Sequence, residues 1–334
     1  MTLLRAAFLI IVFAVGPVSE AASWGASGHS IIAEIAQRRL DPQAARRIRE
    51  LLGDNVSLAS IASWADDLTM SRPDTANWHF VNIPYDAASY DPERDCKATA
   101  RGDCVINAIA RARALLADRK ASRQQRVEAL MLLIHFIGDV HQPLHAANRN
   151  DAGGSQLGVT FFDRPMSLHA VWDYGIIERR TFDWGEYVRY LEQCWLRGKD
   201  IDALQRGTPV DWALEAHRAA VDVAYSVPED LKLGLPYYQN SVPIVDRQLA
   251  LAGVRLAHVL NQTLGYPDRQ RTTQSIARRS PRQETGRSPA SKGSIAALPS
   301  PLGNVDCARG VLEQLGGRPG VLGTDAHPDA DRDR

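Results

Sequence analysis

The sequence predicts a mostly α-helical protein, and three observations support that prediction. Apolar residues recur at three- and four-residue spacing in seven long segments, strand-like runs are confined to two short segments, and no internal repeat is found. The chain has 334 residues, 45% of them apolar, which is ample for a hydrophobic core. We therefore expect a single α-helical domain over residues 24–267, with one short β-hairpin and a disordered C-terminal tail.

The first 23 residues are typical of a secretory signal peptide. Arg5 provides a short basic region, residues 6–15 are apolar, and Ala21-Ala22-Ser23 fits the small residues of a cleavage site. The apolar run is short for a membrane span, so an uncleaved anchor is the weaker alternative. Cleavage after Ser23 would make Trp24 the N-terminus of a secreted or periplasmic protein with no stable membrane association.

The expected elements follow along the chain. The helical segments are residues 27–39, 42–52, 105–116, 123–140, 184–197, 211–225 and 242–264. Residues 78–83 and 158–162 have strand character, and either run could form the hairpin. The Gly-rich residues 150–155 predict a loop before the second run. Residues 268–334 are rich in Arg, Ser, Pro and Gly and lack aromatic residues, which predicts the disordered tail.

The charge balance limits the classes of partner. The formal net charge is zero, which argues against a protein that holds nucleic acid by a broad basic face. The tail is basic, so residues 24–267 are slightly acidic. If the substrate is a phosphodiester, bound metal must therefore supply most of the positive charge.

The four cysteines are consistent with an oxidising compartment. Cys96 and Cys104 flank a short polar loop, which predicts a local disulfide. Cys194 lies in a helical apolar stretch and Cys307 in the tail. These two can pair, or Cys194 can be a buried thiol.

Histidines and aspartates recur at spacings that suit metal ligands. His135 and Asp139 are four residues apart in a predicted helix, so both side chains leave the same face. A proline then ends the helix and lets His145 approach from the next turn. His169 and Asp173 repeat the four-residue spacing on a second, short predicted helix. A single pair of this kind is more often a surface hydrogen bond, but two pairs with His145 close to the first favour a metal site.

Four further residues are candidate ligands. Asp66 ends an apolar helical stretch, where a carboxylate must be capped, paired or metal-bound. His79 lies between two aromatic residues, and a buried core histidine is its alternative interpretation. His29 follows Trp24 closely, and a free α-amine at Trp24, with a pKa near 8, can lose its proton and bind zinc. Nitrogen and carboxylate ligands without a cysteine cluster suit a hydrolytic zinc site. The remaining histidines are expected to be non-ligands, with His141 closest to the site: His141, His217, His258 and His327.

The ordered set of motifs resembles one family, the zinc-dependent type I nucleases, which are mung-bean-type single-strand nucleases and 3′-nucleotidases. The motifs that carry this resemblance, between Trp24 and about Gly265, are Trp24 with His29, Trp-Ala-Asp ending at Asp66, Trp78-His79-Phe80, His135-x3-Asp139-x5-His145 and His169-x3-Asp173. The resemblance implies a mostly α-helical fold around three zinc ions, Zn²⁺.

The resemblance also implies which residues hold each ion. The implied sets are Asp66, His79, His135 and Asp139 for one zinc; His145, His169 and Asp173 for a second; and the Trp24 amine and carbonyl, His29 and Asp139 for a third. Zinc lowers the pKa of a bound water, which then attacks the phosphodiester near neutral pH. Asp66 would orient this water and Asp139 would bridge two ions.

The implied substrates are single-stranded DNA, RNA and 3′-nucleotides, cleaved by a monomer to leave 5′-phosphate ends or to release the 3′-phosphate. A stacked duplex cannot bring its phosphates into a recessed cluster. Phe80 could stack a base, with ordinary core packing as its alternative, and Asn82 could hydrogen-bond a base edge.

Two positions depart from the family pattern. A basic residue is usual where this chain has Thr69, and Arg72 is the nearest substitute. The family's Gly-Gly-Asn is Gly153-Gly154-Ser155 here, so an amide near the phosphate becomes a hydroxyl. Two other functions remain: a zinc-dependent phospholipase C-like phosphodiesterase, which shares the trinuclear plan, and a non-catalytic zinc-binding protein.

Overall fold

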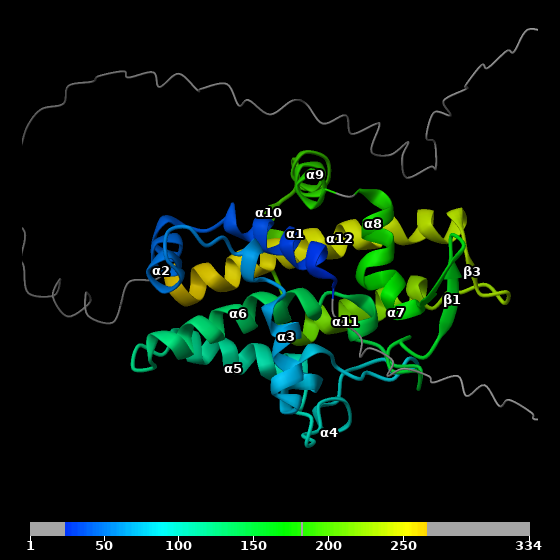
Figure 1. The fold of residues 1–334 in the computed structure, drawn as a ribbon, viewed down its shortest axis with the longest axis horizontal. Coiled ribbons are helices and arrows are strands. Elements are labelled where there is room, and N and C mark those ends of the chain that lie inside the picture. Colours follow the sequence, from blue (N-terminus) through cyan, green and yellow to red (C-terminus); the bar gives the residue numbers. More distant parts are fainter. Residues whose placement is uncertain (1–23, 182, 266–334) are drawn as a thin grey trace, which may run out of the picture.

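The computed structural model describes residues 24–181 and 183–265, and most of these residues are helical (Figure 1). The predicted signal peptide and tail lie outside the described residues. The α-helices are α1 (Ala26–Gln37), α2 (Pro42–Leu52), α3 (Trp64–Ser71), α4 (Pro92–Asp95), α5 (Val105–Ala117), α6 (Arg123–Asp139), α7 (Leu168–Ala170), α8 (Ile176–Arg180), α9 (Trp184–Tyr190), α10 (Ile201–Leu204), α11 (Pro209–Ala219) and α12 (Leu235–Leu260). The mostly α-helical prediction is confirmed.

Short 3-10 and π turns join or extend these helices. They are η1 (Ala59–Ile61), η2 (Pro73–His79), η3 (Pro143–His145), η4 (Val171–Gly175), η5 (Leu191–Trp195), η6 (Ala220–Ala224) and η7 (Asn261–Gly265). Each of the seven predicted helices is present. The predicted last helix starts too late, at residue 242, because Pro236 and Pro243 obscured the helical pattern; α12 accepts the first in its opening turn and the second within the helix.

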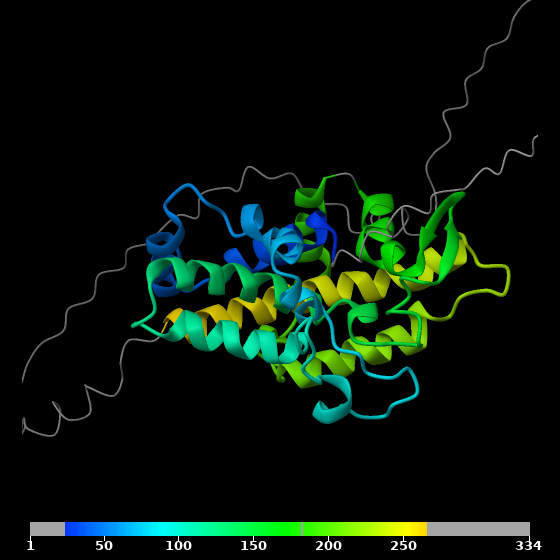
Figure 2. The same ribbon diagram turned by 60° about the horizontal axis from the view of Figure 1, so that its bottom comes forward.

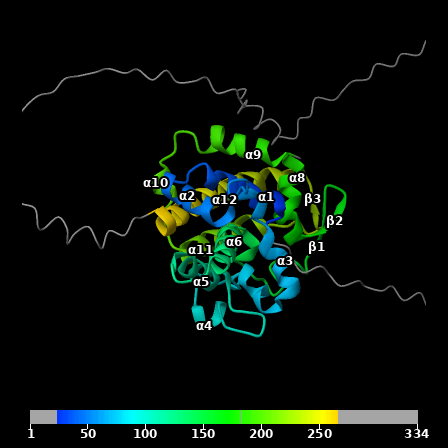
Figure 3. The same cartoon turned by 60° about the vertical axis from the view of Figure 1, so that its left-hand side comes forward.

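Two glycines let three helices approach closely enough to build the site. α12 runs the length of the molecule beside α1, with α5 and α6 on the opposite side from α9 (Figures 1, 2 and 3). A Cβ at Gly253 of α12 would lie 2.5 Å from Cγ2 of Ile35. A Cβ at Gly138 of α6 would lie 2.7 Å from Nδ1 of His29. The absent side chain at Gly138 therefore brings α1 against the end of α6 where two predicted ligands lie.

The hairpin forms at the second predicted run. β1 (Gly158–Phe161) pairs antiparallel with β2 (Arg164–Ser167) through a two-residue turn, Phe162 and Asp163, which have φ of 44° and 68°. A third strand, β3 (Lys232–Leu233), adds parallel to β1, so the sheet has three strands where the sequence predicted a hairpin. This small sheet lies at the opposite end of the molecule from α2 (Figure 1).

The strand predicted at residues 78–83 is wrong. Residues up to His79 form the η2 turn, and the extended residues after it form one isolated parallel bridge, Pro84 with Asn148, rather than a strand. Val81 N–H donates to His145 O at 2.7 Å, whereas Phe80 O accepts from Val105 N–H at 3.0 Å. Because these bonds go in different directions, no ladder forms; instead they fix His79 against the η3 turn that carries His145.

The disulfide between Cys96 and Cys104 is present, as predicted. It closes the polar loop between α4 and α5, and Asn77 N–H donates to Arg101 O across the same region. The second pair that the sequence left open involves Cys307, which lies outside the described residues. Among the helices of the described residues, none combines the length and the apolar character that a membrane span requires.

Candidate metal centre

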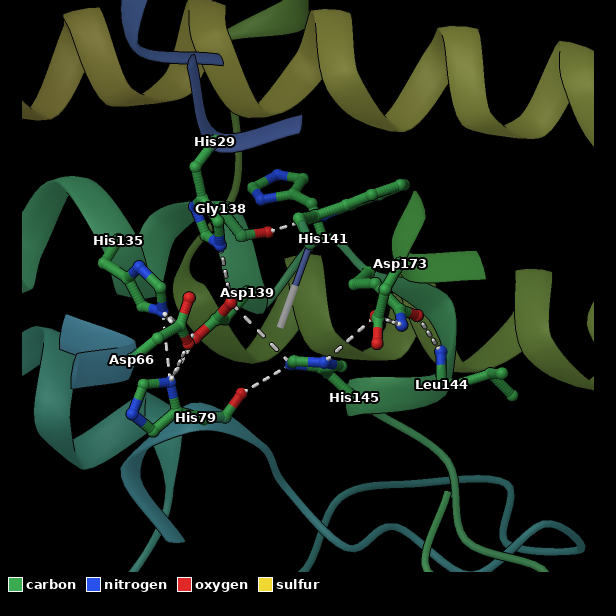
Figure 4. A network of polar contacts seen from close by, with 12 residues as sticks. His29, Asp66, His79, His135, Gly138, Asp139, His141, Leu144, His145 and Asp173 are labelled. Atoms are coloured by element: carbon green, nitrogen blue, oxygen red, sulfur yellow. Dashed lines mark hydrogen bonds and ion pairs between the residues drawn. The ribbon is translucent and has the colours of Figure 1, made fainter. Parts of the chain in front are cut away.

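The predicted ligands come from six separate elements and meet between α1, α3 and α6. α6 carries two of them on consecutive turns, and Figure 4 shows most of the side chains converging on one volume. Their origins are α1 (His29), α3 (Asp66), the end of η2 (His79), α6 (His135 and Asp139), η3 (His145), and the α7–η4 turn (His169 and Asp173). The spacing predicted the pair on α6, and the resemblance implied that the other ligands join it; the structure shows which elements carry them.

We call His29, Asp66, His79, His135 and Asp139 the open group, because it contains the most accessible carboxylate of the centre. The Asp66 side chain is 25% exposed, whereas those of His79 and Asp139 are 8% and 0% exposed. Asp139 Oδ2 lies 3.0 Å from His79 Nδ1 and 3.2 Å from His135 Nε2. Asp66 Oδ1 lies 3.3 Å from His135 Nε2, so both carboxylates face the same imidazole.

The orientation of the histidines in the open group suits cation binding. His135 Nδ1 donates to Ala62 O at 2.8 Å, which directs the lone pair of the neutral ring, at Nε2, toward the group. That Nε2 lies 3.1 Å from His79 Nδ1. The other nitrogen of His79, Nε2, is buried without a hydrogen-bond partner among the described residues. Two ring nitrogens and a buried carboxylate thus converge at one point.

We call His145, His169 and Asp173 the enclosed group, because its side chains are only 2%, 6% and 3% exposed. His145 Nδ1 donates to His79 O and His169 Nδ1 donates to Gly153 O, each at 2.7 Å. Both neutral rings therefore carry their lone pairs on Nε2, and the two Nε2 atoms face each other at 3.1 Å. Two lone pairs at this distance repel unless a cation or a proton lies between them.

His29 and Trp24 close the centre from the side of α1. His29 stacks on His135 with ring centroids 4.0 Å apart, and its Nε2 lies 3.4 Å from Asp139 Oδ1. The Trp24 side chain is fully buried, and its Nε1–H donates to Gly138 O at 3.1 Å. The indole thus anchors the start of the described chain beside the residue that precedes Asp139.

Burial favours neutral imidazoles at three of the ligands, whereas at His135 the charges of Asp139 and Asp66 outweigh burial and raise the pKa in the absence of a cation. Burial lowers the pKa of His29 to about 4, assisted by the charge of neighbouring His135, and it also lowers the pKa of His145 and His169. Burial raises the pKa of Asp173 to about 8 in the absence of a cation. A neutral imidazole is the metal-binding form of histidine, and a nearby dication would restore the ionised form of Asp173.

The geometry defines three sets of donors that can hold a metal ion. Each set has its donor atoms within 4.8 Å of one another: His29, Asp66 and His135; His79, His135 and Asp139; and His145, His169 and Asp173. The third set is the one the resemblance implied. The first groups His29 with Asp66 and His135, and Asp139 Oδ1 also lies 3.4 Å from His29 Nε2.

Nitrogen and carboxylate donors with no cysteine among them suit zinc or a similar borderline ion. The residues present therefore fit the metal that the resemblance implied. His135 Nε2 and Asp139 belong to a set together, as their spacing on one helix face predicted.

The sequence did not reveal Gln142, which supports the enclosed group, or Arg255, which supports the neighbouring His141. Gln142 Nε2 donates to Asp173 Oδ1 at 2.6 Å, and its Oε1 accepts from the Leu144 backbone. His141, predicted to be a non-ligand, donates from Nδ1 to Ile137 O and accepts from Arg255 at 2.9 Å. Neither Gln142 nor Arg255 belongs to a local sequence pattern. The one available signal is the position of Gln142, between His141 and Pro143 in the segment that carries the ligands.

The predicted substrate contacts lie at different places around the centre. Phe80 is half-buried and Asn82 is exposed, two positions apart on the extended segment that follows His79. The Ser155 hydroxyl is buried and has no hydrogen-bond partner among the described residues. Thr69 Oγ1 donates to Asp66 O at 2.8 Å, so this hydroxyl is bound to its own helix.

Arg72 does not present a free charge to the centre. Its guanidinium lies 2.9 Å from Glu128 Oε1 on α6 and 3.7 Å from Asp74 Oδ2, and it packs over the Trp78 ring with its Cζ 5.7 Å from the ring centroid. Two carboxylates thus balance the charge that was considered as a substitute for the basic residue missing at Thr69.

Comparison with known proteins matches the part of the chain that builds this centre. The family model described as S1/P1 Nuclease matches residues 24–265. Endonuclease 2 of Arabidopsis thaliana is 36% identical over 272 residues, covering 72% of this chain and 91% of that protein. Nuclease P1 of Penicillium citrinum is 32% identical over 270 residues, covering 72% and 98%. Nuclease S1 of Aspergillus oryzae is 28% identical over 273 residues, covering 73% and 93%. With its candidate ligands gathered inside the matched residues, this chain belongs to the S1/P1 nuclease family.

Proposed function

We propose that this protein is a zinc-dependent endonuclease and 3′-nucleotidase that cleaves single-stranded DNA and RNA to 5′-phosphate products. One observation carries the proposal: the neutral rings of His145 and His169 face each other with their lone pairs at 3.1 Å, beside a second convergent His–Asp set. Such donor sets hold hydrolytic zinc. Membership of the S1/P1 nuclease family supports a nuclease over the phospholipase C-like alternative.

Three zinc ions would be held by the residues of the two groups. The assignment is Asp66, His79, His135 and Asp139 for the first ion; His145, His169 and Asp173 for the second; and His29, Asp139 and the main-chain amine and carbonyl of Trp24 for the third. Burial of Trp24 and its indole bond beside Asp139 support a role for its main chain. Asp139 is suited to bridge because its two oxygens face different imidazoles.

Bound zinc supplies a Lewis acid and lowers the pKa of water toward neutrality. The protein's own contribution is to orient that water. Asp66 suits this role, because it is the one carboxylate of the centre with substantial exposure. Burial opposes its ionisation, but in the metal-free centre the charge of protonated His135 outweighs burial and lowers the pKa of Asp66, and a bound dication would favour the ionised form in the same way. Asp66 therefore stays ionised and can accept a hydrogen bond from the attacking water at neutral pH.

Recession of the centre explains a preference for single strands. Apart from Asp66, the histidine and aspartate ligands are at most 8% exposed, so a phosphate must enter below the surface to reach them. A single strand can bend its backbone inward, whereas a stacked duplex cannot. Phe80 and Asn82 lie on the segment leaving His79, where a base next to the scissile phosphate can stack and hydrogen-bond.

The departures at Thr69 and Ser155 affect rate and specificity in this proposal. Thr69 carries no charge, and Arg72 is neutralised by its ion pairs. The transition-state phosphate therefore depends more heavily on zinc than in a relative that has a lysine or arginine there. Ser155 keeps a hydroxyl donor in place of the amide.

We further propose that the protein is exported to the periplasm or the medium and acts as a monomer. Signal cleavage after Ser23 would free the Trp24 amine for the third zinc. Mass spectrometry of exported protein should start at Trp24, and an N-terminal extension should remove one zinc and most activity. Full activity with an extended N-terminus would contradict the role of the amine, and size-exclusion chromatography tests the monomer.

The deciding experiment measures zinc content and activity together on protein that starts at Trp24. Single-stranded DNA, RNA, 3′-AMP and a phosphatidylcholine analogue are assayed in parallel. About three zincs with cleavage of the nucleic acids supports the proposal. Turnover of the lipid alone would indicate the phospholipase-like alternative, and three zincs without turnover would indicate a zinc-binding protein. Fewer than two zincs would contradict the proposed metal centre.

A further inference from the structure

Two chain segments lead from the metal centre to a neighbouring surface feature. The segment after His79 and the segment after His145 leave the centre side by side: Tyr85 N–H donates to Asn148 O and Asn148 N–H donates to Ile83 O, both at 2.9 Å. Two hydrogen bonds therefore tie these segments together, and the residues at their far ends have a fixed position relative to the candidate zinc ligands.

Those far ends carry an arginine stacked on tyrosines. Arg149 Cζ lies 5.1 Å from the ring centroid of Tyr85 and 6.0 Å from that of Tyr225. The two tyrosine rings meet edge to face, with centroids 5.4 Å apart. We call Tyr85, Arg149 and Tyr225 the arginine–tyrosine platform. Tyr225 is buried, Tyr85 is half-buried and Arg149 is exposed, so the guanidinium forms the outer surface of the platform.

The charge of Arg149 is available, in contrast to that of Arg72. No carboxylate of the described residues forms an ion pair with the Arg149 guanidinium, whereas Arg72 is paired with Glu128 and Asp74. A guanidinium that lies on an aromatic ring has its edge free to donate hydrogen bonds and its outer face free to stack. These are the two functions that bind a phosphate and a base of single-stranded nucleic acid.

The platform is held rigidly by the loop that follows it. Asp151 Oδ1 accepts from Tyr225 Oη–H at 2.9 Å and from Gly154 N–H at 3.0 Å. Gly153, the residue before Gly154, has φ of 61°, and a Cβ there would lie 2.5 Å from Leu144 O. Gly153 O accepts from His169 Nδ1. One loop therefore orients a zinc ligand at one end and the platform at the other.

His217 fixes the segment that carries Tyr85. Its Nε2 donates to Pro84 O at 2.9 Å, directly before Tyr85, and the imidazole is buried on α11.

The platform lies close to the metal centre along the chain. Arg149 is four positions after His145, which is at most about 14 Å of extended chain. At a rise of about 3.4 Å per nucleotide in a stacked strand, this corresponds to about four nucleotides or fewer.

We propose that the arginine–tyrosine platform is a binding subsite for one nucleotide of a single-stranded substrate, within about four nucleotides of the scissile phosphate. The base stacks on the outer face of the Arg149 guanidinium, and a backbone phosphate accepts its N–H groups. This inference rests on the proposed nuclease function and deepens it. It makes the enzyme favour oligonucleotides over mononucleotides, because a 3′-nucleotide is too short to reach the platform.

The kinetic test compares substrates of different length. Arg149→Ala should lower kcat/KM for the decanucleotide dT10 by about tenfold, chiefly through KM, and leave hydrolysis of 3′-AMP unchanged. Arg149→Lys keeps the charge but loses the planar face, so it should recover only part of the loss. Phe80→Ala should affect both substrates, since that residue lies beside the centre. Arg46→Ala is the matched control, an exposed arginine on α2 at the other end of the molecule.

A binding measurement separates failure of the subsite from failure of the proposed function. Fluorescein-labelled dT10 with phosphorothioate linkages, chosen to resist cleavage, is titrated into zinc-loaded protein at several salt concentrations and followed by anisotropy. Arg149→Ala should weaken binding by about tenfold and reduce the salt slope by about 0.7, the value for one phosphate contact on a single strand. Equal effects of Arg149→Ala on dT10 and 3′-AMP, or no effect on either kinetics or binding, would overturn the proposal. An inactive wild type would refute the nuclease function, and the binding comparison would still decide the subsite.

Discussion

The open and enclosed groups of the metal centre use the same residue types in different surroundings. In the enclosed group, both imidazoles donate from Nδ1 to a backbone carbonyl at 2.7 Å, and Gln142 holds the carboxylate. The open group is assembled from separate helices, and its Asp66 side chain is 25% exposed. Both imidazoles and the carboxylate of the enclosed group are thus held by hydrogen bonds, whereas in the open group His135 has such a bond, to Ala62 O, but His79 Nε2 has none among the described residues, and the arrangement depends more on how α1, α3 and α6 pack.

This difference indicates a division of labour between the groups. Ligands with fixed tautomers and little exposure suit an ion that anchors and polarises a substrate. A carboxylate at the surface of the other group can contact water and substrate directly. The enclosed group should therefore control zinc retention, and the open group should control turnover.

The largest expected effect comes from the residue between the two groups. Asp139 lies 3.0 Å from His79 Nδ1 and 3.8 Å from His145 Nδ1, and it is fully buried. Asp139→Asn should lower kcat/KM by more than about 10³-fold and remove at least one zinc, beyond the 10- to 100-fold usual for a residue that only supports a ligand. Zinc analysis and nuclease assays measure both. The exposed Asp67→Asn is the control, and wild-type zinc content in Asp139→Asn would contradict the bridging assignment.

One aspartate from each group tests whether the open and enclosed groups have different roles. Asp66→Asn should lower kcat about 10²-fold or more, the usual contribution of a group that handles the proton of the nucleophile, while most zinc is retained. Asp173→Asn should instead lower zinc content, because the enclosed group loses one of three side-chain ligands. Metal analysis after dialysis and single-turnover kinetics distinguish the two. If both variants lost zinc equally, the division of labour would be wrong.

A smaller effect is expected from the support of the enclosed group. Gln142 is fully buried, and Gln142→Met removes the hydrogen bond to Asp173 while keeping a similar volume. Zinc affinity of the enclosed group should fall by about 10- to 100-fold. Competition with a chelator measures the affinity, and Gln156→Met, at an exposed position, is the control. An unchanged affinity would show that the Asp173 carboxylate needs no outside support.

Much of the fold was predictable from the sequence, because helical periodicity is a local signal. α2 has the predicted bounds, and a Ser122–Gln125 capping box begins α6 where the prediction placed it. The segment at residues 78–83 was mispredicted because its aromatic and β-branched residues favour a strand, whereas its backbone hydrogen bonds are divided between two distant segments, at Val105 and at residues 145–148. β3 was missed because two residues, Lys232 and Leu233, give no periodic signal.

The candidate ligands were also visible in the sequence, because His135 with Asp139 and His169 with Asp173 repeat one spacing. What the sequence did not contain was their support. Gln142 acts through a contact to Asp173, and Arg255 reaches His141 from a helix more than a hundred residues away. The turn that carries Asp173 is a π turn, not the regular helix that the spacing suggested. Contacts of this kind depend on packing and leave no local pattern.

The smallest expected effect is on the stability of zinc-free protein, where Asp173 makes the stability depend on pH. Burial raises its pKa to about 8 in the folded protein, against about 3.9 in an unfolded chain. Between these values the folded state holds a proton that the unfolded state has released. The stability due to this carboxyl is therefore complete below about pH 4 and is lost as pH rises toward 8.

Asp173→Asn removes this titration and keeps an oxygen that can accept from Gln142. Zinc-free Asp173→Asn should therefore gain stability over zinc-free wild type as pH rises from 5 to 8, by up to about 1.4 kcal/mol per pH unit. Urea unfolding of both proteins at pH 5, 6.5 and 8 measures the difference. Parallel stability curves would show that the carboxyl is ionised even without zinc. A diverging pair would show that the enclosed group is unfavourable as bare protein and that zinc stabilises its ionised form.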